Sequence, residues 1–163
     1  MMKRLSYLLL GALMVACSSV DCPVDSTVAT LYQVRNSDGT ELTLSDTVTV
    51  SMTRADGTDT LFNKGIGISS FSLPISYKHP EDVLVFHFDN TTSVSELHMT
   101  DTVWIKKDDY PHFESVDCTA SFFHTITDLR YTRNYIDSIV INNPKVTYDS
   151  QTVHFYLYPK SDI

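Results

Sequence analysis

The chain has 163 residues, of which 42% are hydrophobic and 20% are charged, and its formal net charge at pH 7 is −8. A chain of this length can bury one hydrophobic core, so a single domain is expected. The negative charge argues against binding to nucleic acid or to an anionic lipid surface, because both need clustered Lys and Arg.

The first sixteen residues are typical of a cleaved export signal. Met1–Arg4 carry two positive charges, the run Leu5–Val15 is mostly apolar, and the small Ala16 precedes Cys17. The apolar run is too short to span a bilayer, and residues 14–17 resemble the bacterial lipobox. We expect cleavage before Cys17 and lipidation of that cysteine, which tethers the chain to a membrane. The alternative is a secreted protein that is cut nearby and keeps Cys17 as a thiol.

Cleavage at this point divides the chain into a signal peptide (1–16), a lipidated tether (17–26) and a folded domain (27–163). The mature chain has 147 residues and a formal charge of −10, because the signal holds two basic residues and no acid. Ser18 and Ser19 follow Cys17, where an aspartate would favour inner-membrane retention. The acidic run associated with surface export is also missing. An outer-membrane anchor with the domain facing the periplasm is therefore expected.

Two further cysteines, Cys22 and Cys118, remain in the mature chain. In an oxidising compartment an even pair favours a disulfide. It would close a loop of nearly one hundred residues and contribute about 4–5 kcal/mol in a chain-entropy model. The alternative, a pair of metal-ligating thiols, lacks the usual C-x-x-C spacing.

Short segments of alternating apolar and polar residues fill the rest of the chain, separated by turn residues. Asp56-Gly57 predicts a hairpin turn, and Pro74 predicts an edge strand or a strand break. About nine to eleven strands and no helix predict an all-β fold, a single β-sandwich of the immunoglobulin type or a relative. The expected strands are Thr27–Arg35, Leu42–Arg54, Thr58–Phe62, Ile66–Ile75, Val83–Phe88, Thr102–Lys106, Phe113–Asp117, Ile126–Tyr131, Ile136–Ile141 and Val153–Tyr158.

Chemistry-bearing residues gather in one stretch, which holds Tyr110, His112, Glu114, Asp117 and His124. In a strand His112 and Glu114 share a face, so they could share a metal ion or a proton. The pairing is a weak signal, because chance placement of one of six histidines beside an acid is the simpler explanation and no complete catalytic or metal motif is present. We expect no enzyme activity, no cofactor and no metal. A metal-dependent enzyme built on His112, Glu114 and His124 is the less favoured alternative.

Aromatic residues are frequent in the same region and just beyond it. Most are expected to fill the core, because aromatic side chains favour strands. Tyr131 and Tyr135 lie among polar residues, so we expect them to be exposed. Together with Tyr110, His112 and Glu114 they are candidates for contact with a ligand or a partner.

Five Asp-Ser or Asp-Thr pairs resemble the O-glycosylation acceptor of Bacteroidetes envelope proteins. The same pattern also suits an acidic turn residue followed by a strand, so both interpretations stay open. The hydroxyl residues concerned are Ser26, Thr47, Thr60, Thr102 and Ser138.

Four segments resemble an uncharacterised envelope lipoprotein family of Bacteroidetes: 17–23 (CSSVDCP), 73–77 (LPISY), 111–118 (PHFESVDC) and 136–144 (IDSIVINNP). The resemblance implies an anchored, β-rich envelope domain and carries no known activity. We expect a non-enzymatic outer-membrane lipoprotein that contacts another envelope protein. A binding module for glycans or another small ligand is the alternative.

Overall fold

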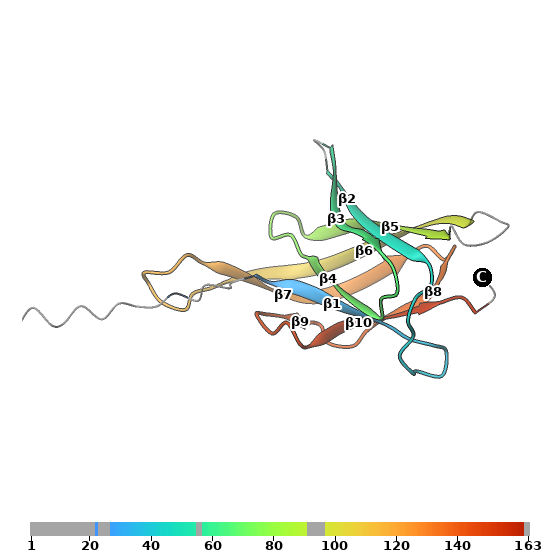
Figure 1. Cartoon of the computed structure of the whole chain (residues 1–163). Coiled ribbons are helices and arrows are strands. Elements are labelled where there is room, and N and C mark those ends of the chain that lie inside the picture. The colour runs from blue at the N-terminus through green and yellow to red at the C-terminus, as the bar shows by residue number, and fades with distance from the viewer. Residues whose placement is uncertain (1–21, 23–26, 55–56, 91–96, 162–163) are drawn as a thin grey trace, which may run out of the picture.

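The computed structural model describes residues 22, 27–54, 57–90 and 97–161, which form ten strands in two packed sheets with no helix among them (Figure 1). The smaller sheet has the strand order β4 (Ser70–Pro74), β1 (Ala29–Val34), β10 (Val153–Pro159) and β8 (Ile136–Ile141). The larger has the order β3 (Gly57–Gly65), β2 (Thr47–Arg54), β5 (Glu81–Asn90), β6 (Leu97–His112), β7 (Ser121–Tyr131) and β9 (Lys145–Val146). The predicted all-β sandwich is confirmed.

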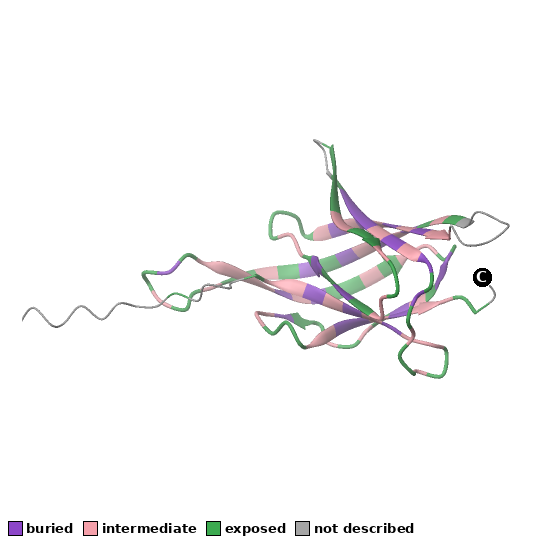
Figure 2. Cartoon of the chain, viewed as in Figure 1, coloured by how far each residue is buried: buried purple, intermediate pink, exposed green. Residues whose placement is uncertain are grey.

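The core lies between the sheets because every second residue of a strand points inward. Figure 2 shows this alternation of burial along the strands, and in β5 buried positions alternate regularly with partly buried ones. At the centre of the core the Tyr32 ring stacks on Phe71 and Phe155, with centroid distances of 5.1 and 4.7 Å. Burial raises the pKa of the Tyr32 hydroxyl far above its usual value.

Most neighbouring strands are antiparallel, and β1 and β10 form a parallel pair. Pro74 ends β4, an edge strand of the smaller sheet, as its missing N–H predicts. The hairpin predicted at Asp56-Gly57 joins β2 to β3, although its residues 55–56 lie outside the described residues.

The largest difference from the expected strands lies in β6. Thr102–Lys106 and Phe113–Asp117 were predicted as separate strands, but the first belongs to the 16-residue β6 and the second is not a strand. The ladder continues past Lys106 because Lys107 and Asp109 find buried polar partners. It ends at His112, where the chain turns and the Cys118 N–H donates to the Ser115 carbonyl at 3.1 Å. The two-residue β9 was too short to predict.

A buried carboxylate holds the connection between β7 and β8. Asp101 is fully buried and accepts a hydrogen bond from the Thr132 hydroxyl at 2.7 Å. The same carboxylate accepts from three successive backbone N–H groups, those of Asn134, Tyr135 and Ile136, at 2.7–2.8 Å. These bonds draw the connection toward the core.

This arrangement overturns the expected exposure of Tyr135. Its side chain is buried, because Asp101 binds its backbone and the ring stacks on Phe88 with a centroid distance of 3.9 Å. The hydroxyl donates to the Asp46 carboxylate at 2.7 Å. Burial and the neighbouring Asp46 raise the pKa of Tyr135. Tyr131 is half-buried and packs against the core, so neither tyrosine matches the expected surface position.

Candidate functional site

A disulfide joins Cys22 to Cys118, with their Cα atoms 5.6 Å apart, as the even cysteine pair predicted. Cys118 follows the turn at the end of β6, so the bond connects the N-terminal segment to the β6–β7 hairpin. Figure 1 shows this hairpin extending beyond the neighbouring strands. The predicted lipidation residue Cys17 lies outside the described residues, five positions before Cys22.

Large apolar side chains are exposed around the end of this hairpin. Phe113 and Val116 lie in the turn after β6, and Tyr110 lies near the end of that strand. Tyr77, from the segment after β4, stacks on Phe122 of β7 with a centroid distance of 4.4 Å. We call the exposed set Tyr77, Tyr110, Phe113 and Val116 the aromatic tip.

The tip has members on both faces of the hairpin, because Phe122, which contacts Tyr77, and Phe123, which contacts Tyr110, are successive strand residues. A second ring cluster packs around Phe123. The His112 ring stacks on Phe123 at 4.2 Å between centroids, and Tyr148 meets Phe123 edge-on at 4.8 Å. Tyr110 meets the same Phe123 ring edge-on at 6.2 Å. The rings hold the hairpin end in a defined shape.

The predicted pair of His112 and Glu114 is in contact. The His112 Nε2 lies 3.1 Å from the Glu114 Oε1, with both side chains partly exposed. His124 does not join them, because it is buried and bonds to Asp109. Among the described residues, no three or more His, Cys, Asp or Glu side chains are grouped to hold a metal ion.

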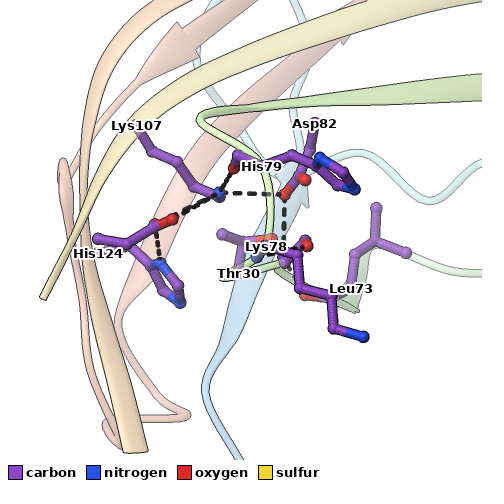
Figure 3. A network of polar contacts seen from close by, with 9 residues as sticks. Thr30, Leu73, Lys78, His79, Asp82, Lys107 and His124 are labelled. Atoms are coloured by element: carbon purple, nitrogen blue, oxygen red, sulfur yellow. Dashed lines mark hydrogen bonds and ion pairs between the residues drawn. The ribbon is translucent and has the colours of Figure 1, made fainter. Parts of the chain in front are cut away.

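An ionic cluster between the sheets was not predicted from the sequence. Its buried members Asp82, Lys107 and His124 are labelled in Figure 3, and the partly exposed Asp109 completes it. The Lys107 Nζ donates to the His79 carbonyl at 2.6 Å and lies 3.3 Å from Asp109 and 3.9 Å from Asp82. His124 Nδ1 and Asp109 Oδ1 are 2.5 Å apart. One sign was available in the sequence. Lys107 stands two positions after Ile105 and four after Val103, so in a strand its side chain points to the same, inward face.

Burial dominates the electrostatics of this cluster. It raises the pKa of Asp82, although the Ser76 N–H and the Lys107 charge act in the opposite direction. Burial likewise lowers the pKa of His124, and the Asp109 carboxylate offsets this in part. Both shifts favour neutral forms, as expected where water is excluded. The Lys107 side chain is wholly inaccessible and that of Asp82 is 3% exposed, so this cluster belongs to the interior of the sandwich and offers no site to a substrate.

The outer face of the larger sheet presents a different surface. Val83, Trp104 and Arg130 are register partners across β5, β6 and β7. The Arg130 guanidinium lies 5.5 Å from the Trp104 ring centroid and donates to Glu81 at 2.7 Å. A half-exposed tryptophan beside an arginine has the composition of a protein-binding hot spot.

An open hollow of about 780 Å³ lies over the 36–39 turn and the C-terminal part of β10. Its lining mixes polar and apolar groups and includes Asn36, Asp38, Asp137, Tyr158 and Lys160. This volume falls within the range of about 300–1,000 Å³ for small-molecule sites.

The predicted glycosylation residues occupy varied positions. Thr60 on β3 is exposed, whereas Thr47, Thr102 and Ser138 are half-buried on their strands, and Ser26 lies outside the described residues. The acids that precede Thr47 and Thr102 are buried and hydrogen-bonded inside the fold. Two of the five pairs therefore have a structural reason for their aspartate, while modification stays a prediction.

These features define a disulfide-linked β-sandwich with an aromatic hairpin end and a buried ionic cluster. None of the described residues forms a helix long and apolar enough to cross a membrane. The chain belongs to a family of unknown function, DUF6452, whose model matches residues 47–159, from the first residue of β2 to the last of β10. Comparison with curated proteins gives no match, and comparison with solved structures gives none either.

Proposed function

We propose that this protein is a non-enzymatic lipoprotein of the Bacteroidetes outer membrane that faces the periplasm and contacts another envelope protein. Its N-terminal signal and Cys17 supply the lipid anchor. The disulfide carries the proposal, because it ties the segment that follows Cys17 to one end of the sandwich. An anchored domain held in this way presents its outer sheet face in a restricted orientation.

The contact surface in this proposal is the outer face around Trp104. Trp104 and Arg130 belong to the residue types that dominate protein interfaces, and Val83 adds apolar area beside them. Charged Glu81, which binds Arg130, supplies a polar margin. The separation of His124 from the His112–Glu114 pair supports a role in contact rather than in catalysis.

The test is photo-crosslinking in the native cell envelope, with the crosslinking amino acid in place of Trp104. The matched control carries it in place of Ser72, which is exposed on β4 of the other sheet. We expect a discrete protein adduct from the Trp104 position, absent from the Ser72 position and lost in a Cys17→Ala variant. An envelope that yields no adduct from Trp104, or the same adducts from both positions, would contradict the proposal.

The open hollow favours a second candidate, a module that binds a glycan or another small ligand. Tyr158 supplies a ring for stacking, and Asp38, Asp137 and Lys160 supply hydrogen-bonding groups. A glycan screen with the wild-type protein and a Tyr158→Ala variant tests this candidate. Binding that is lost in the variant supports it, and equal binding by both proteins removes the hollow from consideration.

A further inference from the structure

The aromatic tip lies close to the proposed lipid anchor because of the disulfide. Five residue steps separate Cys17 from Cys22, which at full extension span about 17–18 Å. The Cα atoms of Cys22 and Cys118 are 5.6 Å apart. Cys118 therefore lies no more than about 23 Å from the lipidated residue, and Val116 is only two positions away.

The side chains at this end are unusually apolar for a surface. Val116 is 97% exposed, Phe113 60%, Tyr77 53% and Tyr110 40%. They sit on an ordered support, since Tyr77 stacks on Phe122 and the Cys118 N–H closes the turn onto Ser115. Tyr77 and Tyr110 are aromatic side chains with a polar end, the kind that membrane interfaces concentrate, and Phe113 and Val116 add apolar area.

The charge of the hairpin indicates the kind of lipid. No Lys or Arg occurs between residues 108 and 129, whereas Glu114 and Asp117 flank the exposed Phe113 and Val116. An anionic lipid surface would repel these carboxylates, and a zwitterionic surface would not.

We propose that the aromatic tip docks into the interface of a zwitterionic bilayer, the same bilayer that holds the lipid on Cys17. This inference rests on the proposed lipid anchor and adds a second membrane contact to it. Two contacts on one side of the domain fix its orientation, because the disulfide keeps the tip within reach of the membrane at high effective concentration.

The test uses the lipidated protein purified from its envelope and reconstituted in phosphatidylcholine vesicles brominated near the headgroup end of one acyl chain. In a Trp104→Phe background, Phe113→Trp or Val116→Trp places the only tryptophan at the tip. Wild-type protein, whose Trp104 lies on the outer face of the larger sheet, is the matched control. We expect bromine to remove roughly half of the tip emission, because interfacial side chains lie about 5–10 Å into the headgroup and acyl boundary.

The outcomes separate this inference from the proposed function. Quenching at both tip positions with an unquenched Trp104 supports it, and replacing part of the phosphatidylcholine with phosphatidylglycerol is then expected to weaken the quenching. Vesicle-bound, lipidated protein whose tip stays unquenched overturns docking and leaves the anchor intact. A chain without lipid on Cys17 overturns both the inference and the proposed anchor.

Discussion

Replacing Lys107 with Met tests the buried ionic cluster. The change keeps the aliphatic stem and removes the only cation from between Asp82 and Asp109, which lie 3.9 and 3.3 Å from its Nζ. Removing one partner of a buried ion pair costs about 3–5 kcal/mol, because the remaining charge is left without compensation. Asp109 is 18% exposed and retains its bond to His124, so we expect the lower end, about 3 kcal/mol.

Urea unfolding at several pH values distinguishes a charge effect from a packing effect. Without Lys107 the folded-state pKa of Asp82 rises still further above its unfolded value. The variant's loss of unfolding free energy should therefore be absent at pH values below the unfolded-state pKa of Asp82. It should grow as the pH rises through the folded-state pKa of Asp82. The deficit relative to wild type should be largest near pH 7 and small near pH 4. Lys107→Met/Asp82→Asn should recover part of the stability at pH 7. A deficit that does not change with pH, or no deficit at pH 7, would refute the ionic role of Lys107.

Three further predictions concern buried polar groups, each measured by denaturant unfolding. Asp101→Asn should lower the free energy of unfolding by about 3 kcal/mol, because the single amide oxygen of Asn cannot accept all four hydrogen bonds that the Asp101 carboxylate accepts. A loss below about 1 kcal/mol would contradict this reasoning. Tyr135→Phe should cost about 1–3 kcal/mol by leaving the Asp46 carboxylate unpaired, and an unchanged midpoint would show that this bond contributes nothing. Burial lowers the pKa values of His124 and His154, so stability should fall as the pH drops from about 6.5 toward their folded-state values. His154→Gln should flatten that slope, and an unaltered slope would exclude His154 as a contributor.

The strand content was predictable because burial on one face of a strand imposes a period of two. Residues 47–52 alternate hydroxyl-bearing and apolar side chains, and they form most of β2. The disulfide was predicted from the even number of cysteines together with the expected oxidising compartment. Pro74 at a sheet edge followed from its missing N–H.

The site residues were less predictable because a β-bulge changes which positions face inward. Lys106 pairs with Asp128, but Lys107 pairs with Ile126, so Thr127 has no register partner. The inward positions of β7 therefore have even numbers before Thr127 and odd numbers after it, which places His124 in the core. A bulge is a property of two paired strands, and the pattern of one strand does not show it.

Tyr135 was mispredicted for a related reason. Its neighbours Arg133 and Asn134 are polar and exposed, so the local sequence indicates a surface loop. The residue that pulls Tyr135 inward is Asp101, which lies 34 positions earlier. The aromatic tip was predicted only in part. Tyr110 was a candidate contact residue, but Tyr77 comes from the segment after β4 and meets Phe122 only in the folded structure.

The most direct test of the proposed anchor is mass spectrometry of the protein purified from its own envelope, digested without reduction. The account predicts an N-terminal peptide that begins at an acylated Cys17 and is joined through Cys22 to the peptide that holds Cys118. The same spectrum reports any glycan on Thr60 or the other predicted hydroxyl residues. A mature N-terminus at another residue, or an unacylated Cys17, would contradict the lipid anchor on which the proposed function depends.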